Sequence, residues 1–214
     1  MPWGKRLFDV VFASILIVLL SPVMAWVCLC LWWKQGAPIF YAAERMKDSR
    51  RSFRLLKFRT MSVAESDQGV SGGHKASRIT PMGAKLRSKR LDEFPQLWNI
   101  LKGDISFVGP RPPLREYVEK FPELYAQVLL NRPGVTGLAS VRFHRHEEHL
   151  LSRAKTQSET ELIYTTLCIP KKARLDLIYQ RHISACFDIL ILFETAKTVF
   201  RRKNSSHRRK TEHG

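Results

Sequence analysis

The chain has 214 residues, of which 36 are lysine or arginine and 19 are aspartate or glutamate, so its formal net charge at pH 7 is +17. Its 44% hydrophobic residues suffice for one domain with a real core, which excludes a largely disordered chain. The charge predicts a polyanionic neighbour: nucleic acid, an anionic lipid surface or a phosphorylated substrate. The four cysteines, at positions 28, 30, 168 and 186, lack the spacing of a zinc site or a disulfide framework and favour a reducing cytoplasm.

Residues 10–33 form a run of 24 residues without a charge. As a helix this run would be about 36 Å long, enough for the hydrocarbon core of a bilayer. Ser21 and Pro22 stand near its middle, and the proline must kink or break the helix because it removes a backbone donor and clashes with the preceding turn. A re-entrant hairpin would return both basic flanks to the cytoplasm, whereas a spanning helix would put Lys5 and Arg6 outside, against the positive-inside preference. A spanning helix with a tolerated proline is the commoner case, so the two topologies are left open. Both put the large basic body in the cytoplasm.

Residues 38–41 and 52–61 are predicted to be two strands of a short hairpin around the polar turn at 47–50. Lys57 and Arg59 are two residues apart, so the period of a strand places both on one face, as a two-cation platform suited to phosphate oxygens. A solvated strand face is the alternative. Residues 64–77 are rich in serine, glycine and acidic residues and predict a flexible loop of the kind that closes over a ligand.

Two adjacent carboxylates, Asp92 and Glu93, stand at the start of an amphipathic helix that Gly103 ends. The partial positive charge of a helix N-terminus favours both carboxylates and an arriving phosphate. The pair could therefore supply a nucleophile and a group that binds a metal ion or transfers a proton. An ordinary N-cap is the alternative. Thr80 and Pro81 open the preceding helix as N-cap and first residue. That helix brings four cations close to the carboxylates: Lys85, Arg87, Lys89 and Arg90.

Arg111 lies between two prolines, Pro110 and Pro112, which restrict the backbone on either side of it. A guanidinium held in this way loses less entropy when it binds phosphate bidentately, which a phosphoryl-transfer site needs. The alternative is a proline-rich surface loop. Residues 117–130 then predict an amphipathic helix, and residues 132–137 a rigid turn.

Residues 175–195 predict a helix or a pair of helices, apolar enough to lie against the membrane or the core. The basic tail at 201–214 is predicted to be disordered and to lie near anionic lipid headgroups. Together these elements predict a mostly helical α+β fold with one small β-hairpin.

Read in order, these segments resemble the bacterial sugar transferase family, the small monotopic phosphoglycosyl transferases that start polyprenyl-linked glycan assembly. The similarity extends from Lys5 to about Thr195. The segments that carry it are Lys5-Arg6-Leu7-Phe8-Asp9, Ser21-Pro22, Pro38-Ile39-Phe40, Lys57-Phe58-Arg59-Thr60-Met61, Arg78-Ile79-Thr80, Leu91-Asp92-Glu93-Phe94-Pro95-Gln96-Leu97, Lys102-Gly103-Asp104, Val108-Gly109-Pro110-Arg111-Pro112 and Arg132-Pro133-Gly134-Val135-Thr136-Gly137.

The resemblance implies a re-entrant membrane helix at 1–34, broken at Ser21-Pro22, a compact cytoplasmic catalytic domain at 35–200 and the basic tail at 201–214. It also implies attachment to the bacterial inner membrane with the catalytic domain on its cytoplasmic face. The implied reaction moves sugar-1-phosphate from a nucleotide diphosphate sugar, usually UDP-linked, to undecaprenyl phosphate and releases UMP. This is the initiating step of exopolysaccharide, lipopolysaccharide or glycoconjugate assembly.

By the same likeness Asp92 would be the nucleophile that forms an aspartyl phosphosugar, with Glu93 assisting beside it. Mg2+ is the implied cofactor, and because this ion takes one or two carboxylates plus substrate phosphates, Asp92 and Glu93 are its expected ligands. Cations must offset the repulsion between the carboxylates and the incoming phosphates. The candidates for that substrate-binding role are Lys57, Arg59, Arg87, Arg90 and Arg111.

The chain departs from the family pattern at three places. The family has a glycine soon after the arginine matched by Arg45, where this chain has Met46 and Lys47; Ala76 replaces an aspartate, and Ser140 a glutamine. Nucleic acid is not an expected partner of the enzyme, and a homodimer is left open. The rival hypothesis is a non-catalytic, membrane-anchored basic module that binds nucleic acid or anionic lipid.

Overall fold

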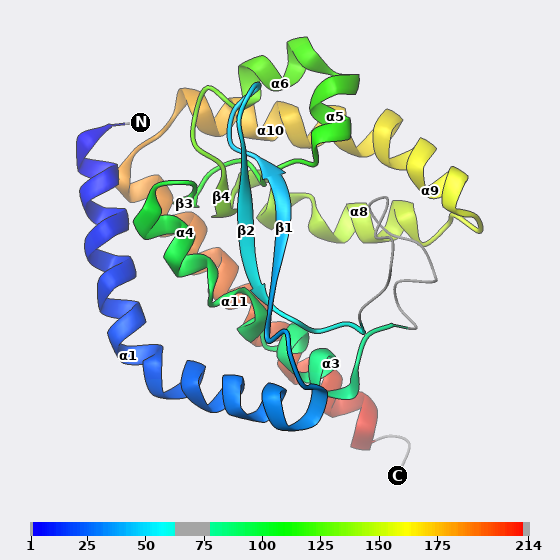
Figure 1. Cartoon of the computed structure of the whole chain (residues 1–214). Helices are drawn as coiled ribbons and strands as arrows, with labels where there is room; N and C mark the ends of the chain where they lie inside the picture. The colour runs from blue at the N-terminus through cyan, green and yellow to red at the C-terminus, as the bar shows by residue number, and fades with distance from the viewer. Residues whose placement is uncertain (1, 63–77, 212–214) are drawn as a thin grey trace.

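The computed structural model describes the backbone of residues 2–62 and 78–211, and the side chains of these ranges as far as residue 198. Within them the fold is mostly helical, with an antiparallel hairpin near the middle and helices around it (Figure 1). The predicted fold class is confirmed in these respects. The loop expected at 64–77 lies outside the described residues.

The first helix, α1 (Trp3–Gln35), has 33 residues and contains Pro22. It remains a single helix but bends near its middle (Figure 1), which matches the expected kink rather than two separate half-helices. The Ser21 hydroxyl donates to the Val18 carbonyl at 2.8 Å. By length and composition α1 could cross a membrane, and large apolar side chains along it are exposed, including Val18, Leu19 and Trp26.

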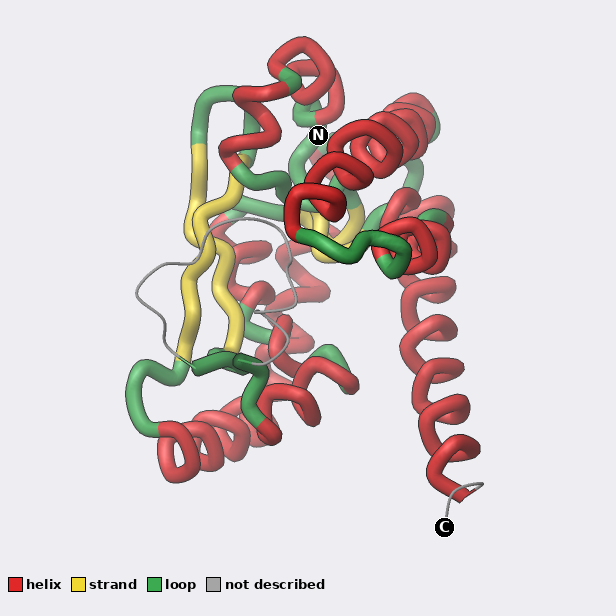
Figure 2. Tube along the Cα trace, turned by 90° about the vertical axis from the view of Figure 1, so that its right-hand side faces the viewer, coloured by secondary structure: helices red, strands yellow, loops and turns green. Residues whose placement is uncertain are grey.

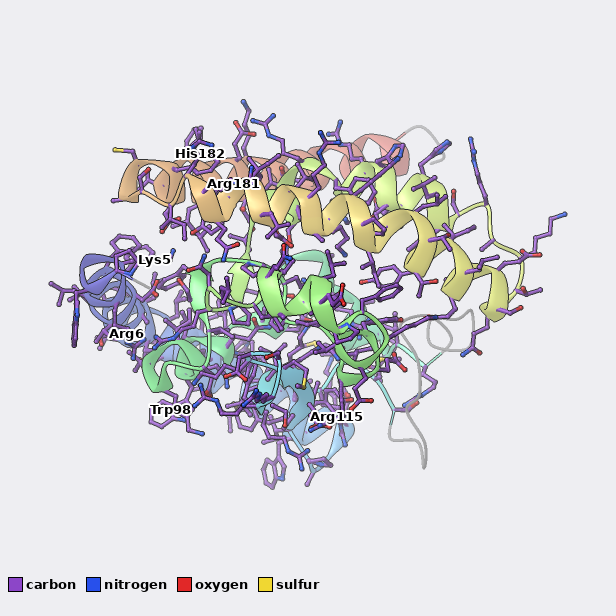
Figure 3. The ribbon with its side chains drawn as sticks, turned by 90° about the horizontal axis from the view of Figure 1, so that it is seen from above. Lys5, Arg6, Trp98, Arg115, Arg181 and His182 are labelled. Carbon is purple, nitrogen blue, oxygen red and sulfur yellow. The ribbon has the colours of Figure 1, made fainter. Side chains whose placement is uncertain are left out.

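The N-terminal end of α1 is fastened to the body by two cations (Figure 3). The Lys5 ammonium pairs with the buried carboxylate of Asp188 and donates to the Tyr179 hydroxyl at 3.0 Å. Arg6 donates to the carbonyls of Ile100 and Leu101 at 2.6 and 2.7 Å. These basic residues therefore satisfy groups of the fold.

The C-terminal end of α1 is fastened by Arg59, which is 9% exposed. Its guanidinium donates to three backbone carbonyls, those of Gln35, Gly36 and Ala37. The expected platform of Lys57 and Arg59 is therefore wrong. The strand ends at Phe58, and the free carbonyls at the end of a helix attract a cation.

The predicted hairpin is confirmed as β1 (Phe40–Met46) and β2 (Ser52–Phe58), which pair antiparallel. The register sets Arg45 opposite Phe53 and Lys57 opposite Tyr41. Phe53 and Leu55 are buried, whereas the neighbouring Arg54 is exposed, so one face of β2 packs inward.

The helix α3 (Pro81–Ser88) begins at Thr80, whose hydroxyl accepts from the Gly83 N–H at 2.9 Å, as predicted. A 3-10 turn, η1 (Leu91–Glu93), and helix α4 (Gln96–Lys102) follow. Gly103 ends α4 with φ +83°, again as predicted. The carboxylates stand in the turn before the helix rather than in its first turn, and Arg90, with φ +55°, introduces that turn.

The sequence did not predict a small parallel sheet of β3 (Ser106–Val108) and β4 (Gly134–Thr136). A Cβ at Gly134 would lie 2.2 Å from the Gly109 nitrogen, so the approach of the two segments depends on glycine. The single helix expected at 117–130 is two helices, α5 (Arg115–Lys120) and α6 (Pro122–Val128), because Pro122 starts a new helix.

The remaining helices are α7 (Leu138–Arg142), α8 (His144–Leu151), α9 (Gln157–Ile163), the π-turn η2 (Tyr164–Cys168), α10 (Ile169–Arg181) and α11 (Ala185–Thr211). The predicted C-terminal helix pair is confirmed as α10 and α11. Residues 201–211 continue α11 beyond the body (Figure 2), where the sequence predicted a disordered tail, and residues 212–214 of that tail lie outside the described residues. A helix already nucleated can extend at little cost because each added residue gains one hydrogen bond.

The main core joins elements from both ends of the chain. Ala13 of α1, Ile100 of α4 and Ile105 are fully buried in it, beside Tyr179 of α10 and Ile191 of α11. Tyr179 and Asp188 are core-facing polar groups, and they hold Lys5 of α1. Helix α1 is thus packed onto the same body that contains the hairpin and η1.

Candidate active site

The two carboxylates lie in η1, between the positive end of one short helix and the inward face of the hairpin. Asp92 is 8% exposed and Glu93 is half-buried. Ionised groups are seldom buried without partners, so their neighbours decide what this turn can do.

Glu93 is held by two cations. Its Oε1 lies 3.5 Å from Lys57 Nζ, and its Oε2 accepts from Arg90 Nε at 3.1 Å. Burial alone would raise the pKa of Glu93, but the charges of Lys57, Arg111 and Arg90 outweigh it and lower that pKa. Glu93 is therefore ionised at neutral pH, and its two cationic partners hold it in place.

The surroundings of Asp92 shift its pKa in the direction opposite to that of Glu93. Burial, and then the charge of Glu93, raise the pKa of Asp92, while Lys57 and Arg87 act against that rise. Arg87 is oriented by a hydrogen bond from its Nε to the Thr60 hydroxyl at 2.8 Å. A desolvated carboxylate that does not form an ion pair with these cations is a better nucleophile than a solvated one.

A pocket opens beside Glu93, and its lining comes from distant parts of the chain: Arg45, Leu55, Lys57, Glu93, Gln96, Arg111, Pro112, Gly134 and Val135. Burial, and then the nearby Arg111, lower the pKa of Lys57. The same two causes lower the pKa of Arg45. Three cations therefore share one small space with a single lining carboxylate, as in a site for a polyanion.

The structure brings four of the five predicted substrate-binding cations to the carboxylates or the pocket, namely Lys57, Arg87, Arg90 and Arg111. Arg59 is not among them, since it holds the end of α1. Ser21 and Pro22 lie within α1, away from the pocket lining. Arg45 is a pocket residue that the sequence analysis did not select. Its position opposite the buried Phe53 would have identified it as a residue on the inward face of the hairpin. That position is known only once the register of the two strands is known.

The protein by itself supplies only part of the ligand set that Mg2+ needs. Among the described residues no group of three or more His, Cys, Asp or Glu side chains could hold a metal ion by itself. Asp92 and Glu93 are adjacent carboxylates, and Mg2+ commonly combines one or two carboxylates with substrate phosphates and water. The donor set therefore fits a metal that arrives with a phosphorylated substrate.

Comparison with known proteins adds independent information. The family described as "Bacterial sugar transferase" matches residues 2–202. A UDP-N-acetylgalactosamine-undecaprenyl-phosphate N-acetylgalactosaminephosphotransferase of Aeromonas hydrophila is 31% identical over 91% of this chain and 43% of its own length. A UDP-glucose:undecaprenyl-phosphate glucose-1-phosphate transferase of Escherichia coli K12 is 32% identical over 93% of this chain and 40% of its own.

A third relative is shorter. The exopolysaccharide production protein ExoY of Rhizobium meliloti is 29% identical over 92% of this chain and 85% of its own length. The chain thus spans less than half of the first two relatives and most of the third. Because the family match covers nearly every described element, from α1 to α11, the chain belongs to the bacterial sugar transferase family.

Proposed function

We propose that this protein transfers sugar-1-phosphate from a UDP-sugar to undecaprenyl phosphate. The observation that carries the proposal is the pair of buried Asp92 and half-buried Glu93 beside a pocket lined by Lys57 and Arg111, in a chain of this family. A diphosphate donor supplies the polyanion for which the pocket has excess positive charge. The named relatives use different sugars, so the sugar itself is not part of the proposal.

The reaction we propose has two steps. An Asp92 carboxylate oxygen attacks the phosphorus next to the sugar, a P–O bond to that oxygen forms, and the bond to the bridging oxygen breaks with its electron pair leaving on UMP. A phosphate oxygen of undecaprenyl phosphate then attacks the same phosphorus, and the Asp92 carboxylate is regenerated. Lys57, Arg87 and Arg111 stabilise the charge that develops on the phosphoryl oxygens.

Glu93 and the metal have supporting roles in this proposal. The ion pairs of Glu93 with Lys57 and Arg90 hold η1 and the strand end in one geometry. Asp92 and Glu93 would be the protein ligands of Mg2+, which when bound neutralises charge on the diphosphate. The carboxylates alone would repel that diphosphate, so metal removal should stop the reaction.

We also propose that α1 enters the membrane from the cytoplasmic face and returns to it. The support is that both of its ends are bonded to one body, through Arg6 at the start and Arg59 at the end. A helix whose two ends are fixed to the same body cannot have them on opposite sides of a bilayer. The bend near Pro22 would then lie deepest, and the exposed apolar side chains would face lipid.

The test of the reaction is single-turnover release of UMP from UDP-glucose, UDP-galactose and UDP-N-acetylgalactosamine, with Mg2+ and without acceptor. We expect the wild-type protein to release one equivalent of UMP from at least one donor and to retain the phosphosugar on a peptide that contains Asp92. Asp92→Asn should lower the rate by at least about 1,000-fold, because the amide cannot form the acyl phosphate. Mass spectrometry of the trapped protein locates the adduct.

The matched control is Asp48→Asn, which changes an acid that caps the hairpin turn outside the pocket. It should release UMP at the wild-type rate. The proposal is abandoned if Asp92→Asn forms product as fast as the wild type, or if no donor of the panel yields UMP while polyanions such as nucleic acid bind in a salt-sensitive manner.

A further inference from the structure

A groove between α6 and α10 shares no lining residue with the pocket beside Glu93. It has a volume of about 400 Å³, and its lining comes from these two helices: Leu124 of α6 and, on α10, Pro170, Arg174, Leu177, Ile178 and Arg181. In Figure 1 both helices lie at the top of the molecule, whereas α1 bends at the lower left. Figure 3 looks down on α10 and labels Arg181 near its end. The groove is thus on the side of the body away from the bend of α1.

The groove continues as an exposed apolar stripe toward α9. Leu162, Leu167 and Ile178 are 61%, 43% and 40% exposed. The π-turn η2 keeps Leu162 and Leu167 in line, because residues five apart are neighbours in such a turn, and Pro170 follows at helical spacing. From Leu162 to Arg181 the stripe is about 28 Å long, or about five helical turns. An exposed apolar surface of this extent is typical of a contact site.

Two arginines border the apolar floor of the groove and lack a matching acid. Arg174 and Arg181 are exposed and seven residues apart, so they lie on one face of α10 about 10 Å from each other. Within residues 2–62 and 78–198, no carboxylate lies within ion-pair distance of either arginine. Leu177 and Ile178 stand between them in the chain. The groove therefore combines an aliphatic floor with two unpaired cations at a fixed spacing.

This chemistry selects among the possible occupants of the groove. Single-stranded nucleic acid stacks its bases on aromatic side chains, and the lining, all of it described, contains none. A second copy of this chain would bring another net charge of +17 against the two arginines. Lipid is expected at the bend of α1, on the other side of the body. An acidic helix fits best, because its apolar face covers the floor and its carboxylates, seven residues apart, match the spacing of Arg174 and Arg181.

We propose that the groove between α6 and α10 is a docking site for an acidic amphipathic helix of another protein. The docked helix buries aliphatic side chains on Leu124, Leu177 and Ile178 and places carboxylates against Arg174 and Arg181. Since α1 carries the apolar surface that enters lipid, such a partner would be recruited to the membrane without entering it. Docking uses no residue of the pocket beside Glu93, so the inference is independent of the proposed reaction.

Two designed peptides of about 18 residues, or five helical turns, test the groove. Both have leucines at helical spacing along one face; the first has glutamates beside them, and the second has lysine at every glutamate position. The full-length protein is held in phosphatidylcholine nanodiscs, and empty nanodiscs are the blank. We expect fluorescence anisotropy to show at least about 10-fold tighter binding of the glutamate peptide, because the rim charges attract it and repel the other. A benzophenone on its apolar face should crosslink to α6 and α10.

Charge reversal tests the two arginines directly. Arg174→Glu/Arg181→Glu should weaken binding of the glutamate peptide at least about 10-fold and strengthen binding of the lysine peptide. Ile178→Asp should weaken binding of the glutamate peptide through the floor of the groove. The matched control, Arg50→Glu/Arg54→Glu, changes the net charge equally at two exposed arginines of the hairpin. Its affinity for the glutamate peptide should stay within about 2-fold of the wild type, since distant exposed charges are screened.

The docking site is refuted if the two peptides bind equally, if the reversal of Arg174 and Arg181 has no more effect than the control, or if the crosslinks fall outside α6 and α10. Two results would give the groove to another occupant and also refute it. One is binding of phosphatidylglycerol vesicles that the reversal abolishes, without peptide binding. The other is a dimer in sedimentation that Ile178→Asp dissociates. The peptide comparison and the crosslink need no substitution, so they still decide if a variant fails to fold.

Discussion

Asp92 and Glu93 are neighbours in the chain, yet their surroundings move their pKa values in opposite directions. Glu93 is ion-paired with Lys57 and Arg90, whereas Asp92 is buried beside the charge of Glu93. Two carboxylates with different environments can take different roles, one structural and one reactive. At the residue scale this difference is the main argument for Asp92 as the nucleophile.

The raised pKa of Asp92 predicts a pH effect on the first step. Asp92 attacks only as a carboxylate, so UMP release should fall as the pH drops through its pKa, at a higher pH than for an ordinary aspartate. Arg87 acts against the raised pKa, so Arg87→Gln should move this acid limb upward by up to about one pH unit. The measurement is the single-turnover rate from about pH 5 to about pH 8.5.

Arg115→Gln is the control for this pH profile. Arg115 pairs with Glu44 at 2.6 Å on the exposed face of the hairpin and is labelled in Figure 3. Its removal should leave the acid limb unchanged. An unchanged limb in Arg87→Gln, with only a uniform loss of rate, would mean that Arg87 does not act on the ionisation of Asp92.

At the scale of elements, α1 is held by arginines that bond to helix ends. Arg59 supplies hydrogen bonds to three carbonyls at the end of α1, and Arg6 supplies two at the end of α4. Such carbonyls have no partner within their own helix and carry partial negative charge. These bonds tie the apolar helix at two widely separated points to the body that contains η1 and the hairpin.

Arg59→Gln should therefore lower stability without removing a pocket residue. A hydrogen bond from a charged donor contributes about 1.5 to 3 kcal/mol, so losing most of this set should cost about 2 to 4 kcal/mol. Chemical denaturation in detergent, followed by tryptophan fluorescence, measures the change. Arg54→Gln, on the exposed face, should change the free energy of unfolding by less than about 0.5 kcal/mol. Equal stability of the two variants would contradict the anchoring role of Arg59.

At the scale of the whole molecule, one body contacts both halves of a bent apolar helix. The N-terminal half packs in the core with Ile191 of α11, and the C-terminal half packs beside Phe58 of β2 and Leu86 of α3. A helix that spanned the membrane would have to give up one of these two contact sets. The fold thus favours insertion from a single face.

This geometry predicts that both termini lie in the cytoplasm. Green fluorescent protein fused to either end should fluoresce in bacterial cells, and alkaline phosphatase fused to either end should be inactive, because that enzyme needs the oxidising periplasm. A fluorescent fusion to a known periplasmic terminus serves as the negative control. Active alkaline phosphatase at the N-terminus alone would show a spanning helix and refute the re-entrant proposal.

Much of the local structure could be predicted from the sequence because it depends on neighbours in the chain. The uncharged run at 10–33, the N-cap at Thr80 and the stop at Gly103 each follow from hydrophobic patterning or from the conformational limits of proline and glycine. These features are correct because they depend on residues close together in the chain and few distant contacts compete with them. The same reasoning placed Asp92 and Glu93 at the start of the helix that Gly103 ends, whereas the structure has them in the 3-10 turn just before that helix.

What only the tertiary structure decided involves residues far apart in sequence. Strand periodicity assigned Arg59 to the phosphate platform, but hydrogen bonds to carbonyls more than twenty residues earlier outweigh it. The β3–β4 pairing joins segments of three residues each, too short for any periodic signal. Arg45 enters the site only through the hairpin register and the approach of Arg111. Local propensity determines where elements begin and end, whereas the partners of a buried charge are determined by the packing that brings distant segments together.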